Sequence, residues 1–136
     1  MTKAARLTKA DFEARAQFRR QLRQFERFGE EVAAKHGITL AQYQVLLQTK
    51  GMPGRSWALV GELAEALMLK HHTAVELVGR CENAGLVLRE RAEDDQRKVR
   101  VTLTPLGERK VQAIATEHRE QLDHLLEHVR QAVGED

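Results

Sequence analysis

The spacing of apolar residues changes at Gly85, and this change does most to restrict the folds open to the chain. Before Gly85, apolar residues recur at intervals of three and four, as they do along one face of a helix. After it, residues 86–91 and 99–104 form two short runs, and Val99, Val101 and Leu103 in the second run alternate with polar residues. The segment between the runs is polar after its first residue. The pattern predicts a β-hairpin with a long charged tip, late in a helical chain.

Helix start and stop signals divide the rest of the chain. Thr8 with Asp11 and Thr39 with Gln42 have the form of N-terminal caps, and Gly37 suits a helix end because glycine accepts the left-handed conformation. Residues 56–59 fit either a short strand or the approach to a helix. The predicted helices cover residues 8–37, 39–50, 60–68, 71–83 and 105–133.

Two of these helices carry broad apolar faces that predict deep burial. In the second helix, the apolar positions are Leu40, Tyr43, Val45, Leu46 and Leu47. In the fourth, the expected buried residues are Ala74, Val75, Leu77, Val78 and Cys81. Only 4% of the 136 residues are aromatic, so the core must be built mainly from aliphatic side chains.

Composition excludes several classes of protein. A length of 136 residues suits one domain, and 42% hydrophobic with 31% charged residues suits a soluble globular protein. No run approaches the roughly 20 apolar residues of a membrane span, and the charged first segment lacks the apolar core of a signal peptide, so we expect a cytoplasmic protein. The single cysteine rules out an intrachain disulfide. There is no glycine-rich phosphate loop, serine-centred elbow or paired-carboxylate motif, so no enzyme and no cofactor is expected.

The order of elements points to DNA. A short helix, a tight break and a second helix fit a helix-turn-helix, and a hairpin that follows directly makes it a winged helix. Arg97 and Lys98 lie at the hairpin tip, where cations reach phosphates or a narrow minor groove. Asp94 and Asp95 are expected to position arginines through ion pairs. Alternatively, the hairpin is a solvated loop of mixed charge.

The same segments resemble the MarR family of bacterial transcription regulators over nearly the whole chain. The resemblance is carried by residues 63–67, by Thr73, by 77–80, by 83–87 and above all by Asp95-Gln96-Arg97 followed by 99–104 and Gly107. This last part is similar to the family's wing signature, in which an aspartate stands two residues before an arginine and an alternating strand ends in Leu-Thr. The order and spacing of the pieces make the match specific.

The resemblance implies a mainly α fold with a small β-hairpin wing, in a single domain over residues 1–136. Residues 1–37 and 105–136 would form a dimerisation region, and residues 38–104 the DNA-binding winged helix-turn-helix, with recognition helix 71–83 and wing 86–104. The residues themselves agree, because a chain this small can hardly bury the long apolar stripes of its first and last helices alone. A homodimer would place two recognition helices about 34–36 Å apart on a palindromic operator in double-stranded DNA.

Candidate DNA-binding residues follow from position and chemistry. The start of the recognition helix normally meets base edges, which singles out Lys70, His71, His72 and Thr73. Glu76 departs from the basic or small polar residue of relatives; it either accepts a hydrogen bond from cytosine or pairs with Arg80, four residues on. Arg80 is either a phosphate contact or a structural partner. The wing adds Arg97 and Lys98, with Asp95 as support.

Members of such a family usually respond to a small-molecule effector, which binds between the dimer helices and the DNA-binding region. Phe25, Phe28, Tyr43 and Trp57 are candidate lining residues, and are equally good core residues. Cys81 stands where relatives usually have leucine, so we expect a buried structural thiol.

A metal site is not expected. His124 and His128 share a helix face and with His118, Glu120 or His36 would supply zinc ligands, but such a pair is usually a surface feature.

The predicted function is therefore a DNA-binding transcriptional regulator, a repressor acting as a homodimer and relieved by a small-molecule effector. Two alternatives stay open. One is a winged-helix protein-interaction dimer without sequence-specific DNA binding. The small net charge of +2 and the acidic Glu76 in the recognition helix favour this alternative. The other is a metal-responsive regulator that uses His124 and His128. No membrane partner is expected.

Overall fold

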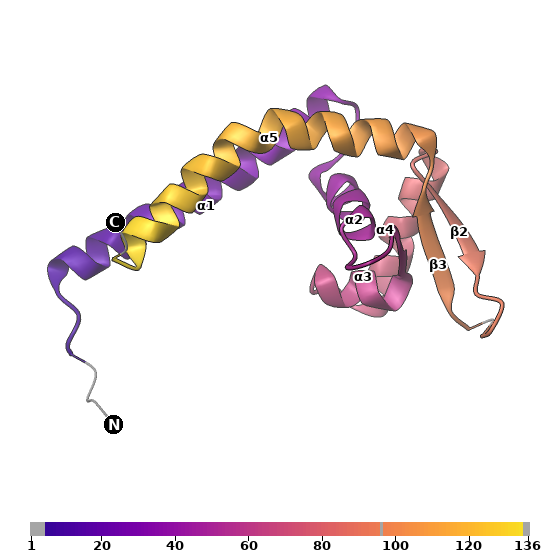
Figure 1. Ribbon diagram of the computed structural model, residues 1–136, viewed down its shortest axis with the longest axis horizontal. Coiled ribbons are helices and arrows are strands. Elements are labelled where there is room, and N and C mark those ends of the chain that lie inside the picture. The colour runs from indigo at the N-terminus through magenta and orange to yellow at the C-terminus, as the bar shows by residue number, and fades with distance from the viewer. Residues whose placement is uncertain (1–4, 96, 135–136) are drawn as a thin grey trace. The chain divides into compact units, whose positions relative to one another are not determined.

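The computed structural model describes residues 5–95 and 97–134 (Figure 1). It is mainly helical with a small antiparallel sheet, which confirms the predicted fold class. Its elements are α1 (Lys9–Lys35), α2 (Leu40–Lys50), β1 (Trp57–Leu59), α3 (Val60–Ala66), α4 (His71–Asn83), β2 (Val87–Arg91), β3 (Val99–Leu103) and α5 (Pro105–Ala132). Every helix within the described residues is too short or too polar to cross a bilayer.

The sheet has three strands, in the order β1-β3-β2. Strands β2 and β3 form the predicted hairpin, with Val87 opposite Leu103 and Arg91 opposite Val99. Strand β1 pairs with the other edge of β3, where Ala58 lies opposite Val101, and both of these residues are fully buried. Residues 56–59, for which the sequence left two possibilities, therefore contribute a strand that ties the wing to the start of α3.

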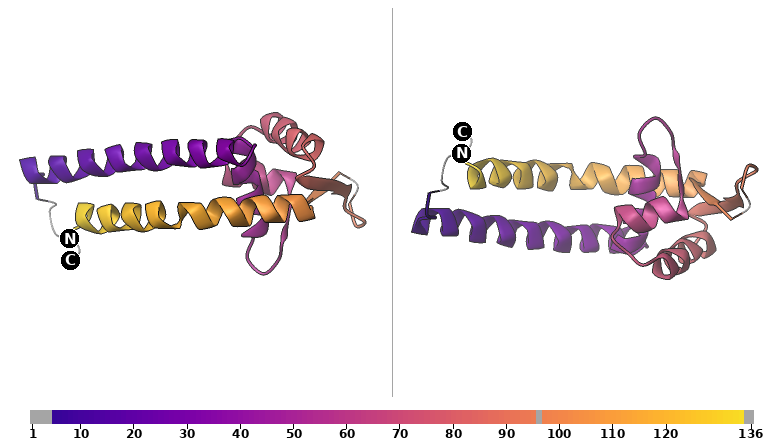
Figure 2. Two further views of the ribbon diagram at one scale, coloured as in Figure 1. Left: turned by 90° about the horizontal axis from the view of Figure 1, so that it is seen from above. Right: turned by 90° about the horizontal axis from the view of Figure 1, so that it is seen from below.

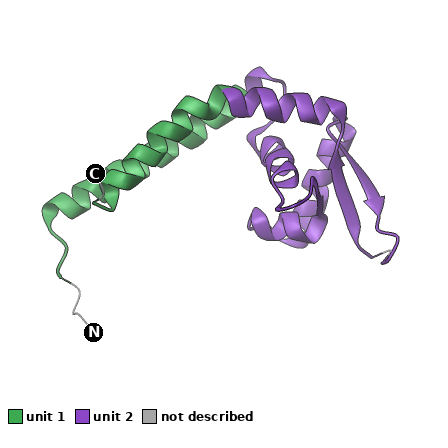
Figure 3. Ribbon diagram, viewed as in Figure 1, with its two compact units in different colours: residues 1–32, 117–136 green, residues 33–116 purple. Residues whose placement is uncertain are grey.

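The chain divides into two compact units (Figure 3): residues 1–32 with 117–136, and residues 33–116. Both long helices contribute to each unit, so the division falls inside α1 and α5. The second unit, residues 33–116, has an aliphatic core drawn from its helices and its sheet. The largest fully buried apolar side chains are Val45, Leu46, Leu63, Val78, Cys81, Leu86, Val87, Val101, Val111 and Ile114.

The first unit is a pair of helical segments. The α1 and α5 segments lie side by side in all three views (Figures 1 and 2). Between them, the His118 ring lies 4.6 Å from the Phe25 ring and 5.4 Å from the Phe28 ring, measured between centroids. Large apolar side chains of this unit remain exposed, among them Phe12, Leu122 and Leu126. The stripes of α1 and α5 are thus only partly covered within one chain.

Two predicted core residues, Val75 and Leu47, are exposed instead. Val75 is 38% exposed and Leu47 is 41% exposed. Each follows a buried residue directly, Ala74 and Leu46, and one step along a helix turns the side chain by about 100°. The buried stripes of α2 and α4 are therefore narrower than a count of apolar residues indicates.

Three helices end in the same hydrogen-bond motif. After α1, Ile38 N–H donates to Ala33 O and Gly37 N–H to Ala34 O, with Gly37 at φ 81°. The end of α4 repeats this around Gly85, at φ 75°. After α3, Leu69 N–H donates to Ala64 O and Met68 N–H to Glu65 O, with Met68 at φ 56°. This is the Schellman motif, whose left-handed position usually holds glycine.

Met68→Gly is expected to stabilise the protein by about 0.5–1 kcal/mol, because a side chain in the left-handed conformation carries strain that glycine does not. The Met68 side chain is 92% exposed, so little packing is lost with it. Urea unfolding at fixed protein concentration measures the change. Met68→Ala removes the same side chain but keeps the Cβ, and it should give no gain; equal gains from both variants would contradict the prediction.

Candidate nucleic-acid interface

Helices α3 and α4 and the turn at Met68 form a helix-turn-helix. The inner face of α4 is anchored by Ala74, Leu77, Val78 and Cys81, all buried. Lys70 is the N-cap residue, with φ −64° and ψ 149°, and no side-chain hydrogen bond caps the helix. The amide groups of the first turn of α4 are thus left without a side-chain cap, at the end where we expect DNA.

The predicted recognition residues fall on the outer surface of α4. Five of them are exposed and Thr73 is half-buried; the exposed five are Lys70, His71, His72, Glu76 and Arg80. No ion pair or hydrogen bond joins Glu76 to Arg80 in the described part of the chain, although their spacing allows one. Both side chains remain available to a partner.

The wing tip holds one arginine in place. Arg97 donates its backbone N–H and its side-chain Nε–H to Asp95 Oδ1, at 3.0 and 3.1 Å, and Nη2 to Oδ2 at 3.3 Å. The Arg97 side chain keeps 92% of its exposure while Asp95 keeps 26%. Hydrogen bonds from Arg97 lower the pKa of Asp95, so the pair stays charged at neutral pH. The expected pairing of Asp95 with an arginine is present; Gln96 between them lies outside the described residues.

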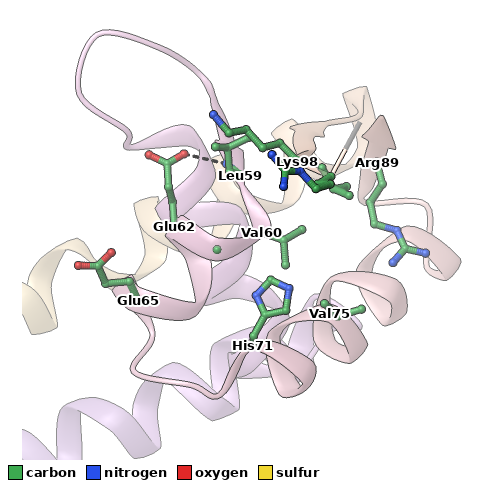
Figure 4. Close-up of a pocket in the computed structure, with 11 residues that line it drawn as sticks. Leu59, Val60, Glu62, Glu65, His71, Val75, Arg89 and Lys98 are labelled. Atoms are coloured by element: carbon green, nitrogen blue, oxygen red, sulfur yellow. Dashed lines mark hydrogen bonds between the residues drawn. The ribbon is translucent and has the colours of Figure 1, made fainter. Parts of the chain in front are cut away.

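A hollow of about 380 Å³ lies between α3, α4 and the wing (Figure 4). Its basic lining residues are His71, Arg89, Arg97 and Lys98. Val60, Val75 and Val99 supply apolar surface, and Glu62 and Glu65 of α3 lie on the opposite side from Arg89. The hollow brings together the predicted start of the recognition helix and the predicted wing tip.

Arg89 is a member of this group that sequence reasoning missed. Its guanidinium donates two hydrogen bonds to Glu82 Oε1, at 3.1 and 3.0 Å, and its backbone N–H donates to Glu82 Oε2 at 3.1 Å. The guanidinium lies 3.7 Å from the place where a Cβ on Gly79 would be, an ordinary contact distance, so this packing does not require glycine. The sequence does not predict this pairing, because Glu82 and Arg89 come together only through the turn that leads from α4 into β2.

Two guanidinium groups lie over the ring of Trp57, a residue of the sheet. Arg55 and Arg100 stand 4.2 and 4.0 Å from the centre of its ring. Arg55 also pairs with Glu62, whose carboxylate accepts a hydrogen bond from Leu59 N–H at 2.9 Å. This cluster fastens β1 and the base of the wing to α3.

The four candidate effector-lining residues fall in different units. Phe25 and Phe28 border a hollow of about 320 Å³ within the first unit, together with Gln21, Gln24, Gln121 and His124. Tyr43 is buried in the core of the second unit, and Trp57 belongs to its sheet. His118 Nε2 and Gln121 Oε1 are buried without a hydrogen-bond partner among the described residues.

The two histidines on α5 lie near each other, and both ring nitrogens of His128 lie close to other polar atoms. The His124 and His128 rings lie 6.4 Å apart, His128 Nδ1 is 2.9 Å from the His124 carbonyl oxygen, and its Nε2 is 3.5 Å from Gln17 Nε2. No group of three or more potential metal-ligating side chains occurs among residues 5–95 and 97–134.

Cys81 is expected to be unreactive in the folded protein. It is fully buried in the α4 interface, and burial raises the pKa of its thiol to about 11. Since the thiolate is the reactive form, the thiol is protonated at neutral pH. A thiol-specific chromogenic disulfide reagent at pH 7.5 should modify Cys81 slowly in buffer and rapidly in denaturant. Rapid modification of the folded protein would contradict this.

Comparison with known sequences gives one family. A model described as MarR family matches residues 36–98, which include α2, α3, α4 and the wing tip. YsmB of Bacillus subtilis, described as an HTH-type transcriptional regulator, is 31% identical over 102 residues. These residues cover 73% of this chain and 66% of YsmB, so the match spans about two thirds of that relative.

Solved structures agree on the fold. AbsC from Streptomyces coelicolor, a MarR family transcriptional regulator, matches with a TM-score of 0.75 at 23% identity, over 96% of this chain and 93% of AbsC. MepR from S. aureus, solved bound to an oligodeoxyribonucleotide, matches with a TM-score of 0.62 at 21% identity, over 82% and 80% of the two chains. At these identities the likeness concerns the fold alone.

Proposed function

The chain belongs to the MarR family of transcriptional regulators, and from this premise we propose that it is a homodimeric repressor that binds a palindromic operator. The observation that carries the proposal is the shared surface of α4 and the wing. Exposed His71, Arg97 and Lys98 border one hollow, and Asp95 holds Arg97 without burying it. Helix α4 would enter the major groove while the wing reaches the flanking minor groove.

Each site residue has a proposed role. Lys70, His71, His72 and Thr73 contact base edges and adjacent phosphates at the start of α4. Glu76, which has no ion pair with Arg80, accepts from a cytosine amino group. Arg80 and Lys98 contact phosphates. Cations that bind phosphates fix the register and orientation of a protein on DNA.

The homodimer is supported by the first unit. Phe12, Leu122 and Leu126 are 57%, 45% and 47% exposed, and the last two lie on one face of α5. Burial of such side chains is the main source of free energy in association. We propose that residues 1–37 and 105–136 supply the dimer interface and residues 38–104 bind DNA.

Release from DNA by a small-molecule effector belongs to the same proposal. The hollow lined by Phe25, Phe28 and three glutamines offers apolar rings beside hydrogen-bonding groups, which is the usual make-up of a ligand site. The regulator would act in the cytoplasm, where the operator is.

Selection of bound DNA from a random pool tests the function. The proposal predicts a palindromic motif, and affinity for it should fall steeply with salt because cations displace counterions from phosphates. Light scattering of the free protein should give the mass of two chains of 15.5 kDa. Recovery of no motif would overturn DNA recognition and favour the protein-interaction alternative, for which exposed Glu76 on α4 is the supporting observation.

A further inference from the structure

We propose that Val75 recognises the C5-methyl group of a thymine in the major groove, which makes it a specificity-determining residue. The Val75 proposal rests on the proposed DNA-binding function and adds a base contact that the sequence pattern did not predict. The spacing of apolar residues predicts that Val75 is buried in the core. In the structure its side chain is partly exposed on the recognition surface of α4.

The burial pattern of α4 places Val75 on that surface. Its side chain is 38% exposed, whereas Ala74 is 1%, Leu77 9% and Val78 0% exposed. It lies one turn after His71 and directly before Glu76, so it shares the outer surface of the helix with the proposed base-contacting residues. Figure 4 shows His71 and Val75 at the edge of the hollow that Arg89 and Lys98 also line.

The neighbours of Val75 leave part of its side chain exposed to solvent. The next residue on the same line of the helix is Gly79, which has no side chain. The Arg89 guanidinium beside Gly79 is fixed by its hydrogen bonds to Glu82 and cannot reach across α4 without breaking them. On the outer surface of α4, Val75 is therefore an apolar residue between polar neighbours, His71 one turn before it and Glu76 directly after it.

The chemistry of valine selects one group in the groove. Valine neither donates nor accepts hydrogen bonds, and the thymine methyl is the apolar group that a base pair presents in the major groove. A single exposed valine is common on protein surfaces, so it is the position on α4 that matters. The nearby cations Arg97 and Lys98 would hold the backbone and bring this position against the base edges.

The test removes the methyl groups from both sides of the contact. Each thymine of the selected motif is replaced in turn by deoxyuridine, which lacks only the C5-methyl, and affinity is measured for the unchanged protein and for Val75→Ala. We expect one thymine per half-site at which uracil weakens binding about three- to fivefold. In Val75→Ala this thymine-to-uracil ratio should fall to about one.

Leu88→Ala is the matched control. Leu88 is a 51% exposed aliphatic residue on β2, outside α4, and its replacement should leave the full thymine-to-uracil ratio. Circular dichroism and the unfolding midpoint establish that both variants are folded. Insensitivity of the unchanged protein to uracil at every thymine, or an undiminished ratio in Val75→Ala, would overturn the Val75 proposal alone. Failure to recover any motif would overturn both proposals.

Discussion

Gly107→Ala should lower the free energy of unfolding by about 2–3 kcal/mol, because the added methyl has no room in the folded protein. A Cβ at residue 107 would lie 2.1 Å from the carbonyl oxygen of Leu86 and 3.1 Å from its carbonyl carbon. The same oxygen accepts a hydrogen bond from Thr104 N–H at 3.0 Å, so it cannot move away without loss. The first turn of α5 and the start of the wing would have to separate.

Gly61→Ala is the control for this prediction. Gly61 lies in α3, and a Cβ there would meet no atom within 4 Å. Alanine favours a helix by up to about 1 kcal/mol over glycine, so this variant should equal or exceed the unchanged protein in stability. Both are compared by denaturant unfolding at one protein concentration, since the proposed dimerisation would make apparent stability depend on concentration. Equal behaviour of the two variants would show that residue 107 has room for a side chain.

Arg97→Ala should weaken operator binding about tenfold or more while leaving the fold intact. The side chain is 92% exposed and its hydrogen bonds are to Asp95 on the same wing tip, so its removal costs the folded protein little. On DNA it would lose a cation from each of two wings. Binding curves at several salt concentrations measure the effect. A phosphate role would also reduce the salt dependence by about one counterion per wing, whereas a minor-groove contact would relax preference at flanking A·T pairs.

Two variants separate this role from others. Arg109→Ala removes an exposed arginine of α5, outside the wing, and should change affinity little. Asp95→Asn keeps the size of the side chain but removes the charge that holds Arg97, and it should produce part of the Arg97→Ala loss. If Arg97→Ala unfolds the protein, the role of Arg97 is structural and its proposed contact with DNA is wrong.

Acidification should release the wing arginine in the same way. Because the pKa of Asp95 is lowered by its bonds to Arg97, the pair persists at neutral pH and is lost as pH falls through that lowered value. Asp95→Asn lacks this carboxylate, so comparing its DNA binding with that of the unchanged protein at each pH isolates the contribution of the pair.

Much of this molecule is determined by local sequence alone. The capping box at Thr39, in which Gln42 N–H donates to Thr39 Oγ1 and Thr39 N–H to Gln42 Oε1, is a matter of residues three apart. The glycines at 37 and 85, the start of α5 at Pro105 and the alternation of β3 are likewise local, and each lies where the pattern predicted. Asp95 and Arg97, which pair with each other, are only two residues apart in the sequence. Such features could be predicted because they depend on neighbours along the chain.

Tertiary structure decided the rest. The third strand exists because β3 has a free edge that β1 can meet, across more than 40 residues of sequence. The exposure of Val75 depends on how far the core reaches around α4, which periodicity does not give. Arg89 joins the recognition surface because the turn after α4 brings it back to Glu82. The change of period at Gly85 determined that a wing follows a helix; only the packing of that wing decided which side chains of the helix face outward.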